Sequence, residues 1–132
     1  MKKFVILLLS LVAFPVFAAD WMDIGNKAYV DLSSIKTENG YVYAWIKVMD
    51  GAAMKPVNGK KVGHYMSYDA YNCDNKKSRN ESIITYGFDG KSLARNDNLP
   101  ANSTWKNVAP ETKEEIWLNA ICKASTLPRQ EY

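Results

Sequence analysis

Two cysteines, Cys73 and Cys122, restrict the folds open to this chain, because its N-terminus is typical of an exported protein. Met1–Lys3 carries two positive side chains, and residues 4–14 form an apolar run. This run is long enough for the core of a signal peptide but shorter than the roughly 18 residues of a membrane-spanning helix. We therefore expect a signal peptide over residues 1–18 and no membrane span. Exported chains oxidise paired cysteines, and these two allow a single pairing, so we expect a Cys73–Cys122 disulfide.

The rest of the chain, residues 19–132, is long enough for one domain with a single core and too short for two. The whole chain has a formal charge of +3, and Lys2 and Lys3 of the predicted signal peptide supply two of these charges. The nearly neutral remainder gives no reason to expect nucleic acid or an anionic membrane surface as the main partner. Residues 126–132 show no periodicity and contain Pro128, which predicts a flexible tail.

Turn dipeptides divide the chain into runs that favour β-strands. Dipeptides of this kind tolerate the positive φ angles of hairpin turns, and the chain has four: Asn39-Gly40, Asp50-Gly51, Asn58-Gly59 and Asp89-Gly90. The runs around them predict strands over residues 28–32, 41–48, 63–73, 81–88 and 91–95, with weaker candidates at 21–24 and 104–108. The sequence therefore predicts an α+β fold with a twisted antiparallel sheet of five to six strands.

The strand over residues 41–48 is apolar on both faces. Side chains alternate between the faces of a strand, which places Tyr41, Tyr43 and Trp45 on one face and Val42, Ala44, Ile46 and Val48 on the other. A strand with one wet face should alternate apolar and polar residues, so this pattern predicts a central strand that is covered on both sides. We expect a C-terminal helix as one cover, and either loops or a second copy of the chain as the other.

A helix is predicted from residue 113 to the end of the run that contains Cys122. Thr112 and Glu115 fit a capping box, in which Thr112 is the N-cap and Glu115 bonds back to its amide. The expected core-facing stripe consists of Ile116, Trp117, Ala120, Ile121 and Ala124. Cys122 lies one step off this stripe and can reach Cys73 at the end of the predicted strand 63–73. The disulfide is thus expected to tether the helix to the sheet.

Two basic clusters are candidate partner-binding sites. Lys60 and Lys61 follow one predicted turn, and Lys76, Lys77 and Arg79 belong to a polar turn after Cys73. They can form an electrostatic patch for an acidic segment of a partner protein. The alternative is that they are charged hairpin ends that keep a sheet edge from pairing. A third set has two readings, since aromatic residues favour strand cores and also binding surfaces: Tyr41, Tyr43, Trp45, Tyr65, Tyr68 and Tyr71.

Catalytic motifs are missing from the sequence. His64 is the single histidine, both cysteines are assigned to the disulfide, and the chain has no Gly-x-Ser-x-Gly elbow. Glu114 and Glu115 are adjacent on the predicted helix and diverge by about 100°, so capping explains them better than paired acid and base roles. We expect no enzymatic activity, no cofactor and no metal site.

Several of these residues occur in an order and spacing that resembles a known family. They are Tyr29-Val30-Asp31 with Ser34-Ile35, Tyr68 with Asn72-Cys73, Tyr86 before a turn, and Val108, Pro110 and Thr112 leading into Ala120-Ile121-Cys122. The pattern resembles the surface-adhesin protein E family of Gram-negative bacteria and covers most of residues 19–132. The resemblance implies an antiparallel sheet with a C-terminal helix held by a disulfide. It also implies a basic host-binding segment just after the first cysteine, where this chain has Lys76, Lys77 and Arg79.

The function that this resemblance implies is that of a non-enzymatic, adhesin-like envelope protein. Expected partners are host extracellular-matrix or plasma proteins, such as vitronectin or laminin, and a homodimer is also implied. The chain is expected to be exported to the periplasm or the outer cell surface. The alternative is a periplasmic inhibitor or accessory protein of another envelope protein. That role predicts a tight one-to-one complex, whereas an adhesin should bind several host proteins in a salt-sensitive manner.

Overall fold

The computed structural model describes residues 19–52, 54–97 and 104–127. The predicted signal peptide and residues 128–132 of the predicted tail lie outside the described residues. The first two residues of that tail are described, follow the end of the helix directly and are hydrogen-bonded to its last turn. The amides of Thr126 and Leu127 donate hydrogen bonds to the carbonyls of Lys123 and Ala124, at 3.1 and 3.2 Å.

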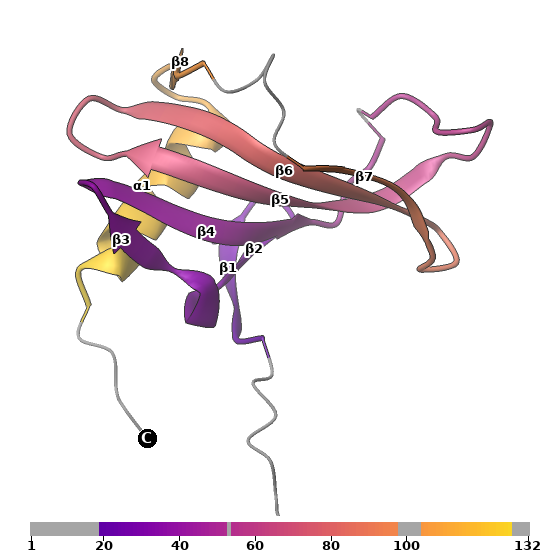
Figure 1. The fold of residues 1–132 in the computed structure, drawn as a ribbon, viewed down its shortest axis with the longest axis horizontal. Helices are drawn as coiled ribbons and strands as arrows, with labels where there is room; N and C mark the ends of the chain where they lie inside the picture. The colour runs from indigo at the N-terminus through magenta and orange to yellow at the C-terminus, as the bar shows by residue number, and fades with distance from the viewer. Residues whose placement is uncertain (1–18, 53, 98–103, 128–132) are drawn as a thin grey trace, which may run out of the picture.

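The described chain forms one antiparallel sheet, one α-helix and a short 3-10 helix (Figure 1). The strand order is β1-β2-β4-β5-β6-β7, while β3 pairs with β4 and β8 pairs with β6. The predicted fold class is therefore confirmed, with two short strands added to a path of six. The elements are β1 (Trp21–Gly25), β2 (Ala28–Asp31), the 3-10 helix η1 (Leu32–Ser34), β3 (Lys36–Glu38), β4 (Tyr41–Val48), β5 (Val62–Asn72), β6 (Lys77–Gly87), β7 (Ser92–Asp97), β8 (Lys106–Asn107) and α1 (Lys113–Ser125).

The core lies between α1 and one face of β1, β2 and β4. Ile46, Val30, Leu118 and Ile121 are its largest fully buried side chains. The alternation in β4 places Val42, Ala44, Ile46 and Val48 against the helix, as predicted. On the other face Tyr41, Tyr43 and Trp45 are partly exposed. The central position of β4 is confirmed, but the described residues cover this second face incompletely.

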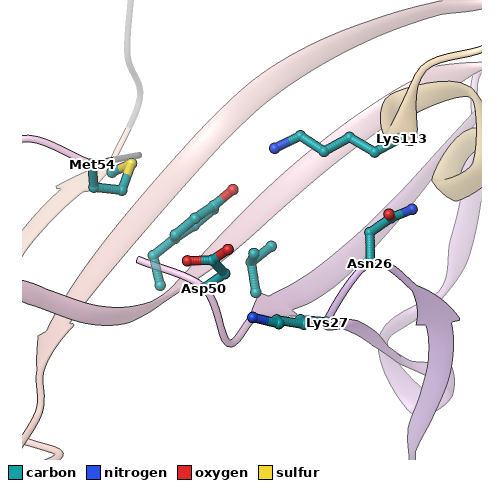
Figure 2. A pocket seen from close by; sticks show the side chains of 7 residues that line it. Asn26, Lys27, Asp50, Met54 and Lys113 are labelled. Atoms are coloured by element: carbon teal, nitrogen blue, oxygen red, sulfur yellow. The ribbon is translucent and has the colours of Figure 1, made fainter. Parts of the chain in front are cut away.

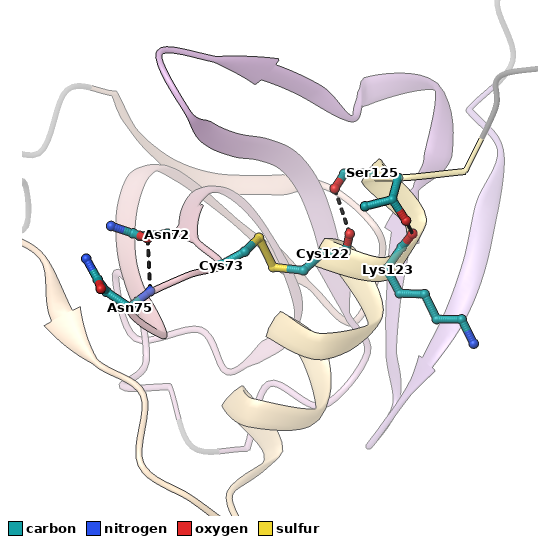
Figure 3. The surroundings of a disulfide bond; sticks show 7 residues. Asn72, Cys73, Asn75, Cys122, Lys123 and Ser125 are labelled. Carbon is teal, nitrogen blue, oxygen red and sulfur yellow. Dashed lines mark hydrogen bonds between the residues drawn. A yellow bond between two sulfur atoms is a disulfide. The ribbon is translucent and has the colours of Figure 1, made fainter.

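The disulfide joins the end of β5 to the third turn of α1 (Figure 3). Cys73 follows β5 directly, and its Cα lies 5.9 Å from the Cα of Cys122. Around the bond, Asn72 Oδ1 accepts a hydrogen bond from the amide of Asn75 at 3.1 Å, and Ser125 Oγ donates to the Cys122 carbonyl at 2.7 Å. The predicted pairing is confirmed.

The start of α1 is capped as predicted, with one difference in the returning contact. Thr112 Oγ1 accepts a hydrogen bond from the amide of Glu115 at 3.3 Å. The Glu115 carboxylate accepts from the amide of Glu111 at 3.4 Å, one residue before the N-cap. Glu111 has a φ of 62°, so the chain turns sharply just before the helix begins.

The core-facing stripe of α1 is rotated relative to the prediction. Ile116 was expected in the core but is 51% exposed, while Leu118 is only 1% exposed. Two contacts fix this rotation: the Cys122 disulfide, and a hydrogen bond of 3.0 Å from the Trp117 indole Nε1 to the Gly25 carbonyl at the end of β1. The prediction for Ile116 was wrong because the spacing of apolar residues carries no information about the disulfide or the Trp117 hydrogen bond.

Two predicted turns also differ from the structure. Asp50-Gly51 does not close a two-residue hairpin, because the chain makes a longer excursion before β5 begins at Val62. The backbone at Gly51 instead packs directly against the backbone at Val62. Only glycine fits there, since a β-carbon at residue 51 would lie 2.3 Å from the Val62 carbonyl oxygen. The turn after Cys73 ends at Lys76, so Lys77 and Arg79 lie within β6 rather than in a loop.

Candidate binding face of the sheet

The sheet face that points away from α1 carries a continuous group of aromatic side chains. We call Tyr41, Tyr43, Trp45, Tyr68 and Trp105 the aromatic strip. Ring centroids lie 5.1 Å apart for Trp45 and Tyr68, 6.0 Å for Tyr43 and Tyr68, and 4.7 Å for Tyr41 and Trp105. All five side chains are partly exposed. Strand pairing therefore assembles an amphipathic surface from β4, β5 and the segment before β8.

Arg79 contacts two residues of the aromatic strip, Tyr43 and Trp105. Its Nε donates a hydrogen bond to Glu81 Oε1 at 2.6 Å, and its Nη2 donates to the Tyr43 hydroxyl at 3.5 Å. The guanidinium carbon lies 4.7 Å from the ring centroid of Trp105. Because these contacts occupy the guanidinium, Arg79 holds Trp105 over the sheet and contributes little free charge to the surface.

Lysines around the aromatic strip are also paired on this face. Lys36 Nζ lies 3.3 Å from Glu38 Oε2 and 5.5 Å from the Tyr43 ring centroid. Lys47 Nζ lies 4.3 Å from the ring centroid of Trp21. The strip thus offers aromatic surface, and the lysines beside it already contact a carboxylate or a ring of this chain.

The five basic residues that were predicted to bind a partner lie at two separate parts of the sheet. Lys76 and Lys77 lie at the end of β5 and β6 nearest the disulfide, and Lys76 Nζ is 3.5 Å from Glu115 Oε2. Lys60 and Lys61 are exposed and lie just before Val62, at the other end of β5. At about 3.4 Å per residue, this strand separates the two groups by roughly 30 Å. Arg79 is the one member that joins the aromatic strip.

Trp105 is the functional candidate that sequence reasoning missed. It belongs to the weak strand prediction over residues 104–108, of which the structure keeps only β8. Its contacts with Tyr41 and Arg79 join residues far apart in the sequence. Periodicity reports only neighbours within one element, so the pattern held no signal for this contact.

His64 packs as a structural side chain. Its ring stacks on Tyr86 with centroids 4.6 Å apart and planes within 4° of each other. Burial lowers the pKa of His64, and the nearby Lys47 ammonium lowers it further. In residues 19–52, 54–97 and 104–127 no group of three or more His, Cys, Asp or Glu side chains is arranged to hold a metal ion.

A hollow of about 250 Å³ opens on the helix side of the sheet (Figure 2). Val48 and Tyr65 belong to its lining. The side chains of Lys27 and Lys113 point toward it from two sides (Figure 2). Asp50 is the one carboxylate in its lining. The hollow lies on the opposite face from the aromatic strip, so the two do not form one site.

A polar network surrounds Asp69 on the helix side of β5. Its Oδ1 accepts hydrogen bonds from Ser67 Oγ at 2.6 Å and from Asn80 Nδ2 at 2.8 Å, and its Oδ2 accepts from the Tyr71 hydroxyl at 3.3 Å. Burial raises the pKa of Asp69 above its ordinary value of 3.8, and these hydrogen bonds offset part of the rise. The network links β5 to β6 beside the core.

The raised pKa of Asp69 predicts a pH-dependent contribution to stability. A group with a raised pKa in the folded state stabilises the fold below its unfolded pKa, and this contribution is lost as pH rises through the folded pKa. In Asp69→Asn the titration is absent. The free energy of unfolding of the wild type relative to this variant should therefore decrease from acid to neutral pH, as measured by urea denaturation. The exposed Asp74→Asn is the control, and a relative stability that increases with pH would contradict the assignment.

The part of the chain that the structure describes contains no helix long and apolar enough to cross a membrane.

Comparisons with known proteins agree with the fold. The family model for surface-adhesin protein E matches residues 18–123, most of the chain. The structure is similar to crystal form II of Haemophilus influenzae protein E, with 20% identity and a TM-score of 0.54, covering 74% of this chain and 80% of that one. The selenomethionine form of the same protein gives 20% identity and a TM-score of 0.56, covering 78% and 85%.

At this identity the structural likeness shows the fold alone, and a comparison with curated protein sequences found no match. The family assignment rests on the match of the family model over residues 18–123. This chain belongs to the surface-adhesin protein E family and is an adhesin-like envelope protein.

Proposed function

We propose that this protein binds host extracellular-matrix or plasma proteins, such as vitronectin or laminin, through the aromatic strip, and that it catalyses no reaction. The observation that carries the proposal is the partly exposed strip of five aromatic side chains on the face away from α1. Tyr and Trp are enriched at protein interfaces and dominate their binding energy. Membership of a surface-adhesin family supports a protein partner rather than a small substrate.

The rigidity of the aromatic strip favours this role. Strand pairing fixes the backbone of Tyr43, Trp45 and Tyr68, and the contacts of Arg79 hold Trp105 in place. Side chains that are ordered before binding lose less conformational entropy on association. Lys77, which lies two residues before Arg79 in β6, adds positive charge near the strip for an acidic segment of the partner. Lys76 is instead paired with Glu115 of α1.

The same aromatic strip also suits a second copy of this chain. Its residues are apolar enough to bury, and the described residues leave them partly exposed. A homodimer through this face would compete with a host protein for the strip. Measurement of the molecular mass in solution, with and without the variant described next, separates the two uses of the face.

Replacement of two residues of the strip should weaken partner binding. Tyr43→Ser/Trp45→Ser removes two rings from the centre of the face, and loss of central aromatic contacts costs about tenfold or more in affinity each. Binding is measured to immobilised vitronectin and laminin over a salt series. The control is Ile116→Ser, which changes an exposed apolar residue on α1. Equal binding by both variants would contradict a role for the strip.

The location of the protein is tested on intact cells. Protease treatment should cleave the protein while a periplasmic marker survives, which places it on the outer surface. If both are protected, the periplasmic alternative replaces the adhesin proposal. In that case a tight one-to-one complex with an envelope protein should be recovered by affinity capture, and the Tyr43→Ser/Trp45→Ser variant should show whether the strip forms that complex.

A further inference from the structure

An exposed aromatic residue and three lysines share the end of the sheet farthest from the disulfide. Val62 at the start of β5 pairs with Gly87 at the end of β6. Lys61 and Phe88 lie directly beyond this pair, and both turns leave the same end of the sheet (Figure 1). A β-carbon at Gly63 would lie only 3.1 Å from the Cα of Phe88, so the two strands approach closely here. We call Lys60, Lys61, Phe88 and Lys91 the basic tip.

Phe88 is held outward by a tightly bonded turn. Its side chain is 81% exposed, the highest value among the large exposed hydrophobic residues of the described chain. The amide of Gly87 donates to the Lys91 carbonyl at 3.0 Å, and the amide of Gly90 donates to the Gly87 carbonyl at 3.1 Å. These bonds fix the backbone on both sides of Phe88 at its exposed position.

The second turn of the basic tip is equally well defined. Val57 and Lys60 exchange two backbone hydrogen bonds of 2.9 Å, and Asn58 and Gly59 adopt the positive φ angles of 51° and 75° that a two-residue turn needs. Lys60 and Lys61 leave this turn with exposed side chains. The fixed backbone therefore presents the two charges next to each other in front of β5.

The charge of the basic tip is positive although residues 19–132 as a whole are nearly neutral. The two turns, residues 57–61 and 88–91, contain the three lysines of the tip and one carboxylate, that of Asp89. The Asp89 Oδ1 accepts a hydrogen bond from the amide of Lys91 at 3.0 Å, which turns the carboxylate toward the backbone of its own turn. This local excess of positive charge is not visible in the net charge of residues 19–132.

We propose that the basic tip docks on an anionic lipid surface, with Phe88 inserted among the headgroups and Lys60, Lys61 and Lys91 at the lipid phosphates. Aromatic and apolar residues beside lysines are the composition that binds membrane interfaces. Both turns extend beyond the end of β5 and β6 (Figure 1), where a lipid surface can reach their side chains. A specific protein interface typically buries about 800 Å² on each partner, whereas an exposed ring and neighbouring lysines are enough for contact with an anionic lipid surface. The tip lies at the far end of β5 from Cys73, so this inference goes beyond partner binding by the aromatic strip.

The test uses vesicles of phosphatidylcholine with and without phosphatidylglycerol, and the purified wild-type chain. Co-sedimentation should show binding to the anionic vesicles, weaker binding at high salt, and little binding to phosphatidylcholine alone. Lys60→Gln/Lys61→Gln should lower the partition coefficient by about 25-fold, since each lysine near an anionic surface contributes roughly fivefold. Phe88→Ser should also lower it, whereas Phe88→Trp should retain it, because tryptophan suits the membrane interface.

Matched controls change the same chemistry elsewhere on the surface. Lys106→Gln/Lys123→Gln removes two exposed lysines outside the basic tip, and Leu127→Ser removes another exposed apolar residue. Both should bind anionic vesicles like the wild type. The proposal fails if the wild type does not bind these vesicles at low salt, or if Phe88→Ser and Lys60→Gln/Lys61→Gln bind as well as the controls. It also fails if Phe88→Ser impairs binding only to vitronectin or laminin, because the tip would then contact protein.

Discussion

Loss of the Cys73–Cys122 disulfide should lower the free energy of unfolding by about 4 kcal/mol and the melting temperature by about 15 °C. The bond joins residues separated by 49 positions, and a cross-link over a loop of this length restricts the unfolded chain strongly. A domain of this size has a net stability on the order of 5 to 15 kcal/mol, so the loss is a large part of the total. Thermal unfolding of Cys73→Ser/Cys122→Ser by circular dichroism measures it.

Reduction of the wild type provides the matched comparison. With reductant, the wild-type melting temperature should fall to that of Cys73→Ser/Cys122→Ser, and the variant itself should not respond to reductant. α1 is expected to separate from the sheet first, because the bond holds its third turn against the end of β5. A wild-type melting temperature that reductant leaves unchanged would mean that the bond contributes nothing to stability.

The sequence predicted the parts of the fold that depend on local chemistry. Two cysteines allow one pairing, and Thr112 has the hydroxyl and the spacing to Glu115 that a helix cap requires. The alternation of residues in β4 was enough to separate the helix-facing side chains from the aromatic ones. The helix cap and the alternation in β4 depend on residues within a few positions of one another. The disulfide was predictable because two cysteines can pair in only one way.

Elements without an apolar pattern were missed. β3 (Lys36–Glu38) is fully exposed, so no burial periodicity marks it as a strand. The turn between β1 and β2 is formed by Asn26 and Lys27, with φ angles of 54° and 59°, although lysine is not a usual residue for this conformation. Pairing of β1 with β2 determines that turn, and tertiary structure therefore overrides the local preference.

The candidate site was predictable only in part, for a related reason. The sequence indicated that Tyr43, Trp45 and Tyr68 could form a binding face, and strand register places them together. It also grouped Arg79 with the free charges of a turn, whereas β6 begins at Lys77 and places Arg79 against Trp105. Which charges are available to a partner depends on contacts between distant segments, and a single sequence does not record these contacts.

Truncation of Leu118 should destabilise the protein far more than truncation of Ile116. Leu118 is 1% exposed in the core against the sheet, and replacement of a buried leucine by alanine costs about 2–5 kcal/mol through lost burial and the cavity that remains. Ile116 is 51% exposed, and substitutions at such surface positions cost about 0.5 kcal/mol or less. Urea denaturation of Leu118→Ala and Ile116→Ala measures both. Since apolar spacing alone favoured Ile116 as a core residue, a larger loss for Ile116→Ala would mean that α1 is rotated relative to the contacts of Trp117 and Cys122 described above.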